Sequence, residues 1–343
     1  ANELPLNLAE LRTVRQRISD AVIETPLWAN DFMSREFGAQ IFFKLENLQR
    51  TGSFKLRGAS NKINRLLASG KKIRGVIAAS AGNHAQGLAR AAMAAGLPAT
   101  VVMPVSAPLT KIESCKTLGA EVILSGSTLE DAKQVADALA TERQLEFVHP
   151  YDDWDVIAGQ GGVGLEIFEA LPDVGTVIVP LGGGGLISGI ALAIKLQRPA
   201  TRIVGVQTAA VAPFRNFLRD GTLETVLPGA HTIADGIKVK APGQLTRQVI
   251  ARYVDEIVVV DDNAIAEAMV AMLERTRTIG EGAGVVGLAA LMKGLVVPRE
   301  GESIAVVVSG GNADMSLVGR SIDYGLASSG RLMSLVVTMP DSP

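Results

Sequence analysis

Short apolar runs alternate along the chain with longer segments in which alanine and leucine recur at helical spacing. The runs are rich in valine and isoleucine and are apolar at consecutive positions. A strand has this character when helices cover both faces of its sheet, as in parallel sheets with crossover helices. The pattern predicts strands at 75–80, 99–104, 121–126, 175–182, 202–207, 256–262 and 303–311, and helices at 83–96, 128–144, 186–197 and 263–278.

Polar and turn-forming residues at 149–155 (HPYDDWD) separate two blocks of this alternation, and a second boundary lies near residue 50. We therefore expect an α/β protein with two doubly wound parallel-sheet lobes. The large lobe would comprise residues 1–49 and 151–325, and the small lobe residues 50–150. A helical stretch at 313–326 is followed by a tail, 326–343, in which the pattern predicts a loop and an alternating strand.

Composition favours a protein that acts on small molecules. The 343 residues carry a net charge of −2 without a basic block, which argues against a nucleic-acid or anionic membrane partner. No apolar run approaches the roughly 20 residues needed to span a bilayer, and the start of the chain reads as an amphipathic helix, not a signal peptide. The single cysteine, Cys115, excludes an internal disulfide and indicates a reducing compartment, so we expect a cytoplasmic protein.

Four consecutive glycines, Gly182–Gly185, join a predicted strand to a predicted helix. Glycines let the backbone fold closely around an anion, and the start of a helix offers unpaired N–H groups. The loop lacks the lysine of a Walker motif and the spacing of a dinucleotide fingerprint. We interpret it as a phosphate-binding loop in preference to a flexible turn.

Three further loops have simpler alternatives. The stretch 80–87 (SAGNHAQG) opens a helix and could bind a carboxylate or phenolic oxygen, but a capped helix explains it equally well. His84 alone is more often structural than catalytic. The stretch 309–312 (SGGN) follows a strand and could be a tight turn, and Glu281 in 281–284 (EGAG) could be an ordinary charge at a helix start.

Lys55 lies between Phe54 and Leu56 and is flanked by Gly52 and Gly58. Apolar neighbours fit either an exposed edge or a lysine drawn into a pocket. Together, a lysine amine, a phosphate loop, an oxygen-binding loop and a neutral hydroxyl suit pyridoxal 5'-phosphate, which enzymes hold through a lysine. Lys44, in a strand close to Glu46, needs no special role.

The motifs SFKLRGA, SAGNHAQG, GQGGVGLEI, PLGGGGLISGIA, TIADGIKV, EGAG and SGGN occur in this order. Over residues 10–325 the chain thereby resembles the threonine dehydratase and serine racemase branch of fold-type II pyridoxal-phosphate enzymes, whose fold is that of the tryptophan synthase β subunit. The resemblance implies that Lys55 is the catalytic residue and holds the cofactor aldehyde covalently. Its apolar neighbours then lead us to expect a partly desolvated amine of lowered pKa.

The resemblance also assigns further site residues. It implies cofactor contacts from Phe54, Lys55, Asn83, Gly182, Gly183, Gly184, Gly185, Leu186 and Ser309. It implies substrate contacts from Ser80, Ala81, Gly82, Asn83, His84, Gly236 and Glu281.

The implied reaction is β-elimination from L-threonine, and from L-serine, to 2-oxobutanoate or pyruvate plus ammonia. Racemases of this kind carry a serine where this chain has Ala81, whose methyl group cannot transfer a proton, so dehydration is favoured over racemisation. A 3-hydroxyaspartate dehydratase remains open, and a non-catalytic amino-acid sensor is disfavoured by the intact Lys55. Because 205–213 lacks acidic residues, we expect no dedicated divalent metal site there.

The resemblance implies a homo-oligomer in amino-acid metabolism, with isoleucine biosynthesis and catabolism both open. It further implies that residues 326–343 begin a truncated regulatory domain of the ACT type. The alternative is a native tail strand that pairs with a partner subunit.

Overall fold

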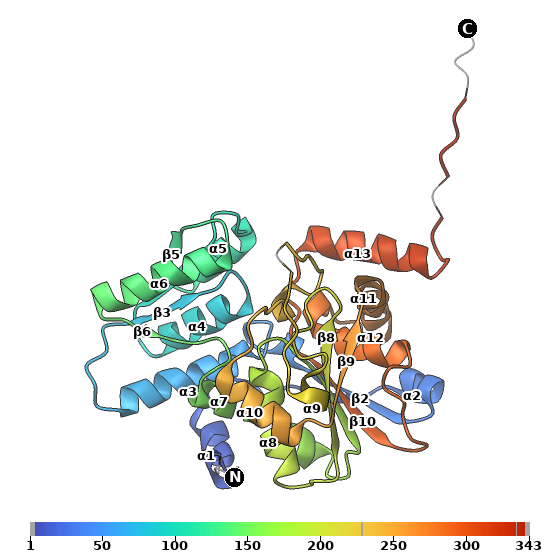
Figure 1. Cartoon of the computed structure of the whole chain (residues 1–343), viewed down its shortest axis with the longest axis horizontal. Helices are drawn as coiled ribbons and strands as arrows, with labels where there is room; N and C mark the ends of the chain where they lie inside the picture. Colours follow the sequence, from blue (N-terminus) through green and yellow to red (C-terminus); the bar gives the residue numbers. More distant parts are fainter. Residues whose placement is uncertain (1–3, 228, 334, 340–343) are drawn as a thin grey trace.

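The computed structural model describes residues 4–227, 229–333 and 335–339. Two sheets form its framework (Figure 1). The larger sheet has the strand order β1-β2-β10-β7-β8-β9 and is parallel except for the antiparallel pairing of β1 with β2. Its strands are β1 (Leu27–Ala29), β2 (Gln40–Leu45), β7 (Thr176–Pro180), β8 (Arg202–Thr208), β9 (Glu256–Val260) and β10 (Ser303–Val308).

The smaller sheet is parallel throughout, in the order β5-β4-β3-β6. Its strands are β3 (Val76–Ala79), β4 (Ala99–Met103), β5 (Glu121–Leu124) and β6 (Glu146–Phe147). All four strands lie within residues 76–147, whereas the strands of the larger sheet come from residues 27–45 and 176–308. The lobe boundaries near residues 50 and 150 stay a prediction.

Helices pack on both sheets (Figure 1). They are α1 (Leu8–Arg17), α2 (Asp31–Phe37), α3 (Lys55–Ala68), α4 (Asn83–Ala94), α5 (Leu109–Thr117), α6 (Leu129–Arg143), α7 (Trp154–Ala170), α8 (Gly185–Lys195), α9 (Phe217–Asp220), α10 (Gln244–Tyr253), α11 (Asp262–Thr276), α12 (Val286–Met292) and α13 (Met315–Ser328). Three short 3-10 helices are η1 (Glu46–Leu48), η2 (Asp235–Ile237) and η3 (Gly282–Gly284).

The central strands are apolar throughout because alternate side chains enter different cores. Val177 and Val179 of β7 pack in one core with residues of α7 and α8. Ile178, between them, packs in another core with residues of α11 and α12. All three side chains are fully buried, as expected for a strand covered on both faces.

The strands and helices predicted between residues 75 and 326 all form, but some ends differ. The runs 175–182 and 303–311 were expected to be strands throughout, yet β7 ends at Pro180 and β10 at Val308. Beyond these ends the chain turns: Gly184 adopts a left-handed φ of 93°, and Gly310 forms an isolated bridge with Ser53. Neither β1, with its antiparallel pairing, nor the two-residue β6 was foreseen.

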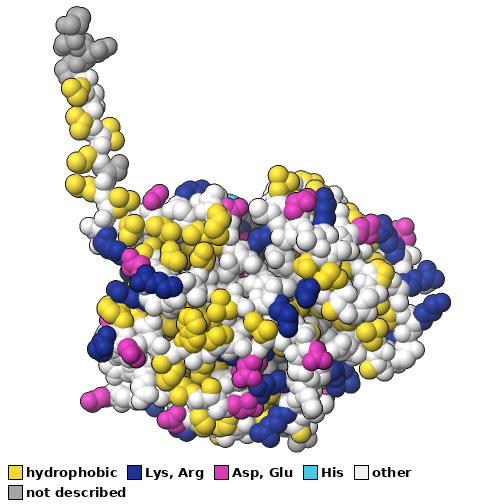
Figure 2. Space-filling view, turned by 180° about the vertical axis from the view of Figure 1, so that it is seen from behind, with side chains coloured by type: hydrophobic (Ala, Val, Ile, Leu, Met, Phe, Trp, Pro, Cys, Tyr) yellow, Lys and Arg dark blue, Asp and Glu magenta, His cyan; other side chains and the backbone are white. Residues whose placement is uncertain are grey.

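The strand predicted in the tail does not form among the described residues. Met333 and residues 335–339 lie away from the body, with their apolar side chains exposed (Figures 1 and 2). An apolar alternation becomes a strand only when a neighbouring strand pairs with it, and no described residue does so. The regulatory-domain interpretation stays a prediction.

Candidate active site

Lys55 is the first residue of α3. Its Nζ donates a hydrogen bond to the carbonyl oxygen of Pro150 at 2.8 Å and lies 5.1 Å from the centroid of the Phe54 ring. Burial lowers the pKa of the Lys55 amine to about 8, and the nearby Glu281 carboxylate opposes this shift. Lys55 is partly buried, in agreement with the expectation of a partly desolvated amine, whereas its catalytic role stays a prediction.

The tetraglycine turn, Gly182–Gly185, leads from β7 into α8. The backbone N–H groups of residues 182–187 donate to no acceptor among the described residues. Unpaired donors at a helix N-terminus, together with the helix dipole, form an anion-binding site. The turn therefore has the donors that a phosphate group requires.

Each glycine of this turn is also required by its protein neighbours. Gly184 has a positive φ of 93°, which other residues rarely adopt. A Cβ on Gly182 would lie 2.9 Å from the Cα of Ile237, and Cβ atoms on Gly183 and Gly185 would meet Tyr151. The sequence interpretation, which considered only the anion, was incomplete.

The N-terminus of α4 provides a second set of free donors. The N–H groups of Ala81, Asn83 and His84 have no acceptor among the described residues, while the Gly82 N–H donates to Ser80 Oγ at 3.3 Å. These groups can bind a carboxylate.

The His84 side chain is already engaged elsewhere. Its Nε2 lies 2.8 Å from the carbonyl oxygen of Val148, and burial together with the Lys55 charge lowers the pKa of the imidazole to about 3. The ring is therefore neutral and donates to Val148, which favours the structural interpretation of its side chain. A substrate contact from His84 would come from its backbone.

Glu281 and Asn83 meet beside these loops. Asn83 Nδ2 donates to Glu281 Oε1 at 2.6 Å, and burial raises the pKa of the Glu281 carboxyl. A Cβ on Gly310 would lie 2.3 Å from the same oxygen, and one on Gly236 3.7 Å from it. The structure thus brings Asn83, Gly236 and Glu281 together from three distant segments.

Ser309 follows β10 and is tied to the start of α3. Its carbonyl oxygen accepts a hydrogen bond from the Phe54 N–H at 3.1 Å. Ser309 is 4% exposed, and its hydroxyl forms no hydrogen bond with the described residues. A neutral hydroxyl therefore remains available at the end of β10, whose backbone is bonded to the residue before Lys55. Leu186, in contrast, is a buried core residue of α8.

Two residues at the site were missed by the sequence analysis. Asn312 Nδ2 donates to Asn83 Oδ1 at 2.9 Å and to the Thr51 carbonyl oxygen at 2.6 Å. Tyr151 packs against the tetraglycine turn. Asn312 stood within the SGGN motif, and Tyr151 within the stretch interpreted only as a lobe boundary, so neither carried a separate signal.

A buried ion network anchors α3 behind Lys55. The Arg57 guanidinium binds Glu46 Oε1 at 2.8 Å and Glu166 Oε1 at 2.6 Å, and Lys44 Nζ binds Glu166 Oε2 at 2.6 Å. All four side chains are at most 4% exposed. The view that Lys44 needs no special role was wrong, because an amine buried in β2 requires this partner.

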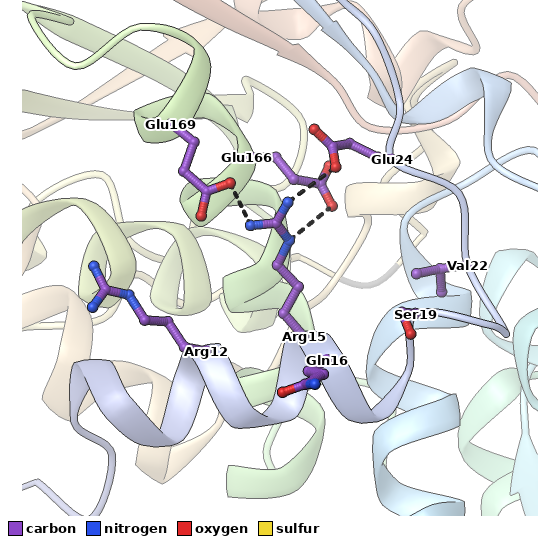
Figure 3. A pocket seen from close by; sticks show the side chains of 8 residues that line it. All are labelled: Arg12, Arg15, Gln16, Ser19, Val22, Glu24, Glu166 and Glu169. Atoms are coloured by element: carbon purple, nitrogen blue, oxygen red, sulfur yellow. Dashed lines mark hydrogen bonds and ion pairs between the residues drawn. The ribbon is translucent and has the colours of Figure 1, made fainter.

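The network continues to the surface through Arg15 (Figure 3). Arg15 binds Glu169 at 2.5 Å and Glu24 at 3.0 Å, and its Nε lies 4.0 Å from Glu166. A cavity of about 420 Å³ opens here between α1 and α7. None of the predicted site residues lines this cavity, and its carboxylates are paired with Arg15, so it is not the candidate active site.

The described part of the chain has neither a metal-binding cluster nor a membrane-spanning helix. Within residues 4–227, 229–333 and 335–339, no group of three or more His, Cys, Asp or Glu side chains could hold a metal ion. No helix in that part of the chain is long and apolar enough to cross a membrane. The absence of a divalent site at 205–213 stays a prediction.

Residues 18–310 match the family model described as pyridoxal-phosphate dependent enzyme. The chain belongs to this family, and its cofactor is pyridoxal 5'-phosphate. It is 46% identical to an L-threonine ammonia-lyase of Thermotoga maritima over 98% of this chain and 83% of that protein. It is 42% identical to a catabolic L-threonine dehydratase of Staphylococcus aureus, over 94% of this chain and 93% of that one.

Solved structures give the same picture of the fold. A maize serine racemase superposes with a TM-score of 0.87 at 35% identity, covering 95% of this chain and 100% of its own. A threonine deaminase from the organism abbreviated T.th. superposes with a TM-score of 0.84 at 36% identity, covering 90% of this chain and 99% of its own. The fold-type II architecture is thereby confirmed.

The residues present fit this cofactor. A partly buried amine of lowered pKa suits an aldehyde, the free N–H groups at the start of α8 suit a phosphate, and the unpartnered Ser309 hydroxyl suits a ring nitrogen.

Proposed function

We propose that the protein converts L-threonine to 2-oxobutanoate and ammonia, and L-serine to pyruvate and ammonia. Two relatives that are 46% and 42% identical to this chain over nearly its whole length are named L-threonine ammonia-lyase and L-threonine dehydratase. The observation that carries the proposal is the Lys55 amine, which is partly buried, has a lowered pKa and donates a hydrogen bond to Pro150. Pro150 is followed by Tyr151, which packs on the anion-binding turn.

We assign the cofactor contacts to four places. Lys55 holds the aldehyde, the N–H groups of residues 182–187 hold the phosphate, Ser309 faces the ring nitrogen, and Asn83 faces the phenolic oxygen. When bound, pyridoxal phosphate supplies a carbonyl for the substrate amine and a conjugated ring that takes up the electron pair left at Cα.

Lys55 is the proposed base. When free, its Nζ would take the proton from the substrate Cα. With a pKa of about 8, about one tenth of the amine is neutral at pH 7. The N–H groups at the start of α4 hold the substrate carboxylate and so fix the Cα–H bond relative to Nζ. The Cα proton and the hydroxide from Cβ leave as one water molecule. Hydrolysis of the dehydrated product then consumes one water molecule and releases ammonia, so the net reaction needs no other reactant.

A serine racemase is the second candidate, since a maize serine racemase is among the similar structures. Racemisation requires a proton donor opposite Lys55. The position that would supply it by resemblance is Ala81, whose methyl group cannot do so. A 3-hydroxyaspartate dehydratase differs only in the side chain accepted, and its discrimination depends on pocket shape.

A substrate panel tests the proposal. Purified protein loaded with pyridoxal phosphate is supplied with L-threonine, L-serine and 3-hydroxyaspartate, and 2-oxo acid and D-serine are measured in parallel. We expect 2-oxobutanoate from threonine at the highest rate and none from Lys55→Ala. D-serine formed faster than pyruvate would establish the racemase instead.

We further propose a cytoplasmic homo-oligomer that acts in amino-acid metabolism. The lone, buried Cys115 supports a reducing compartment. The catabolic name of the Staphylococcus relative favours catabolism over isoleucine biosynthesis. Sedimentation of the purified protein would give its assembly state.

A further inference from the structure

The segment from Val148 to Asp152 contacts His84, Lys55 and the tetraglycine turn, each with a different residue. The Val148 carbonyl accepts from His84, and the Pro150 carbonyl accepts from Lys55. The carboxylate of Asp152 accepts from three N–H groups at the start of α10. Between these contacts, Tyr151 is the residue that reaches the tetraglycine turn.

The Tyr151 ring lies flat against Gly183. A Cβ on Gly183 would be 2.3 Å from Cγ and Cδ1 of the ring and 2.6 Å from Cδ2. A Cβ on Gly185 would meet a different part of the tyrosine, 3.0 Å from its Cα and Cβ. Two glycines of the turn therefore accommodate one residue.

The ring itself is fixed. The Tyr151 hydroxyl donates to the Ala241 carbonyl oxygen at 2.8 Å, and the His149 ring packs edge-on with centroids 4.6 Å apart. Burial raises the pKa of the Tyr151 hydroxyl to about 12, so it stays protonated and able to donate at physiological pH. On the other side of the turn, Thr246 Oγ1 donates to the Gly183 carbonyl at 2.8 Å.

The amine and the anion-binding turn come from helices far apart in sequence, α3 and α8. Two consecutive residues connect them: Pro150 accepts the hydrogen bond of the amine, and Tyr151 packs on the turn. We propose that Tyr151 is a positioning residue that holds the tetraglycine turn at the distance from Lys55 that the cofactor requires. This inference rests on the cofactor contacts proposed above.

Cofactor binding to the apo-protein tests it. Pyridoxal phosphate and pyridoxal, which lacks the phosphate, are titrated into the wild type, Tyr151→Phe and Tyr151→Ala, and thermal unfolding checks that each variant is folded. We expect Tyr151→Ala to weaken pyridoxal phosphate binding by about tenfold or more, with little effect on pyridoxal. Tyr151→Phe, which keeps the ring, should stay within about threefold of the wild type. Unchanged binding of pyridoxal phosphate by Tyr151→Ala, or equal losses for both ligands, would overturn the proposal.

A compensating pair makes the test sharper. In Gly183→Ala the new methyl group collides with the ring, so we expect loss of pyridoxal phosphate binding or of folded protein. Adding Tyr151→Ala removes the ring and should recover at least part of what was lost. In Gly185→Ala the methyl meets the backbone and Cβ of Tyr151, so Tyr151→Ala should give no recovery. An equal defect of Gly183→Ala with and without the ring would contradict the proposal.

The variant Lys55→Ala distinguishes a failure of the proposed cofactor site from a failure of the role proposed for Tyr151. Visible absorbance of protein-bound pyridoxal phosphate in Lys55→Ala equal to that of the wild type would overturn the proposed cofactor site itself. If that absorbance is lost while Tyr151→Ala binds normally, only the role of Tyr151 fails.

Discussion

At the scale of single residues, the low pKa of Lys55 has the most direct consequence. An ordinary lysine with a pKa of 10.5 is almost entirely protonated at neutral pH, and burial of Lys55 lowers this value to about 8. The neutral amine is the form that reacts with an aldehyde. The pH dependence of cofactor uptake should therefore report on this one group.

We expect the rate constant for pyridoxal phosphate uptake by the apo-protein to rise about tenfold per pH unit below pH 8 and to level off above it. Below the pKa, each unit of pH increases the neutral fraction tenfold, and above it the amine is already neutral. Stopped-flow absorbance would measure the rate, with Lys55→Ala subtracting the reaction of exposed lysines. A rate that still rises tenfold between pH 9 and 10 would show an unperturbed amine.

The sequence predicted residues whose chemistry is visible locally. The glycines at 182–185 and the polar start of α4 were recognisable because each forms a contiguous sequence motif. Asn312 could not, because what matters is its bond to Asn83, 229 positions away. The same reason hid Tyr151, whose partner Gly183 is in another element.

At the scale of elements, the buried ion network anchors the first turn of α3 through Arg57. Arg57 lies 11 positions from Glu46 and 109 from Glu166. No periodic sequence pattern therefore predicts that these three side chains form ion pairs. Buried charges of this kind are costly to leave unpaired, since they have been removed from water. The helix that carries Lys55 is fixed by these bonds two residues beyond the amine.

Replacing Arg57 by Met should lower the free energy of unfolding by about 3–5 kcal/mol, because Glu46 and Glu166 lose their main partner within the protein. Urea denaturation followed by circular dichroism would measure it. Lys133→Met is the control, since its exposed pair with Asp137 on α6 should contribute less than about 0.5 kcal/mol. Equal stability of the Arg57 variant and the wild type would contradict the role given to the network.

Asp152 acts as the cap of α10 from outside that helix. Its carboxylate accepts the N–H groups of Gln244, Leu245 and Thr246. Asp152→Ala should cost about 0.5–2 kcal/mol in the free energy of unfolding, and Asp152→Asn less, because an acceptor oxygen remains. Chemical denaturation of the three proteins would rank them. Identical losses in both variants would show that the charge matters and the acceptor does not.

At the scale of the whole molecule, the described residues beyond Leu332, which are Met333 and 335–339, are exposed. Val336 is 92% exposed and Met333 76%, whereas Arg331 still pairs with Glu274. A chain ending at Leu332 should therefore keep the thermal midpoint and the specific activity of the full chain. It should also bind less of an apolar dye, since exposed methionine, valine and leucine side chains are removed.

Calorimetry and dye fluorescence of the two proteins would check this. A fall in the midpoint of more than a few degrees would mean that the tail packs on the body in solution.

The fold class was predictable because strands buried on both faces are apolar at every position, and the alternation with helices then specifies parallel sheets. The order of the strands was not. The sequence of β2 does not predict that it pairs with β10, because the pairing of parallel strands distant in the chain has no local sequence signal.

This pairing sets an order of events during synthesis. Strand β2 ends at Leu45, and its parallel neighbour β10 starts at Ser303, so the larger sheet stays incomplete until nearly the whole chain has left the ribosome. The smaller sheet needs only residues 76–147 and can assemble early. Strand β2 can pair early with β1 on one edge, but its other edge, which β10 covers in the folded protein, must stay unpaired for most of translation, the period in which a chaperone would be of most use.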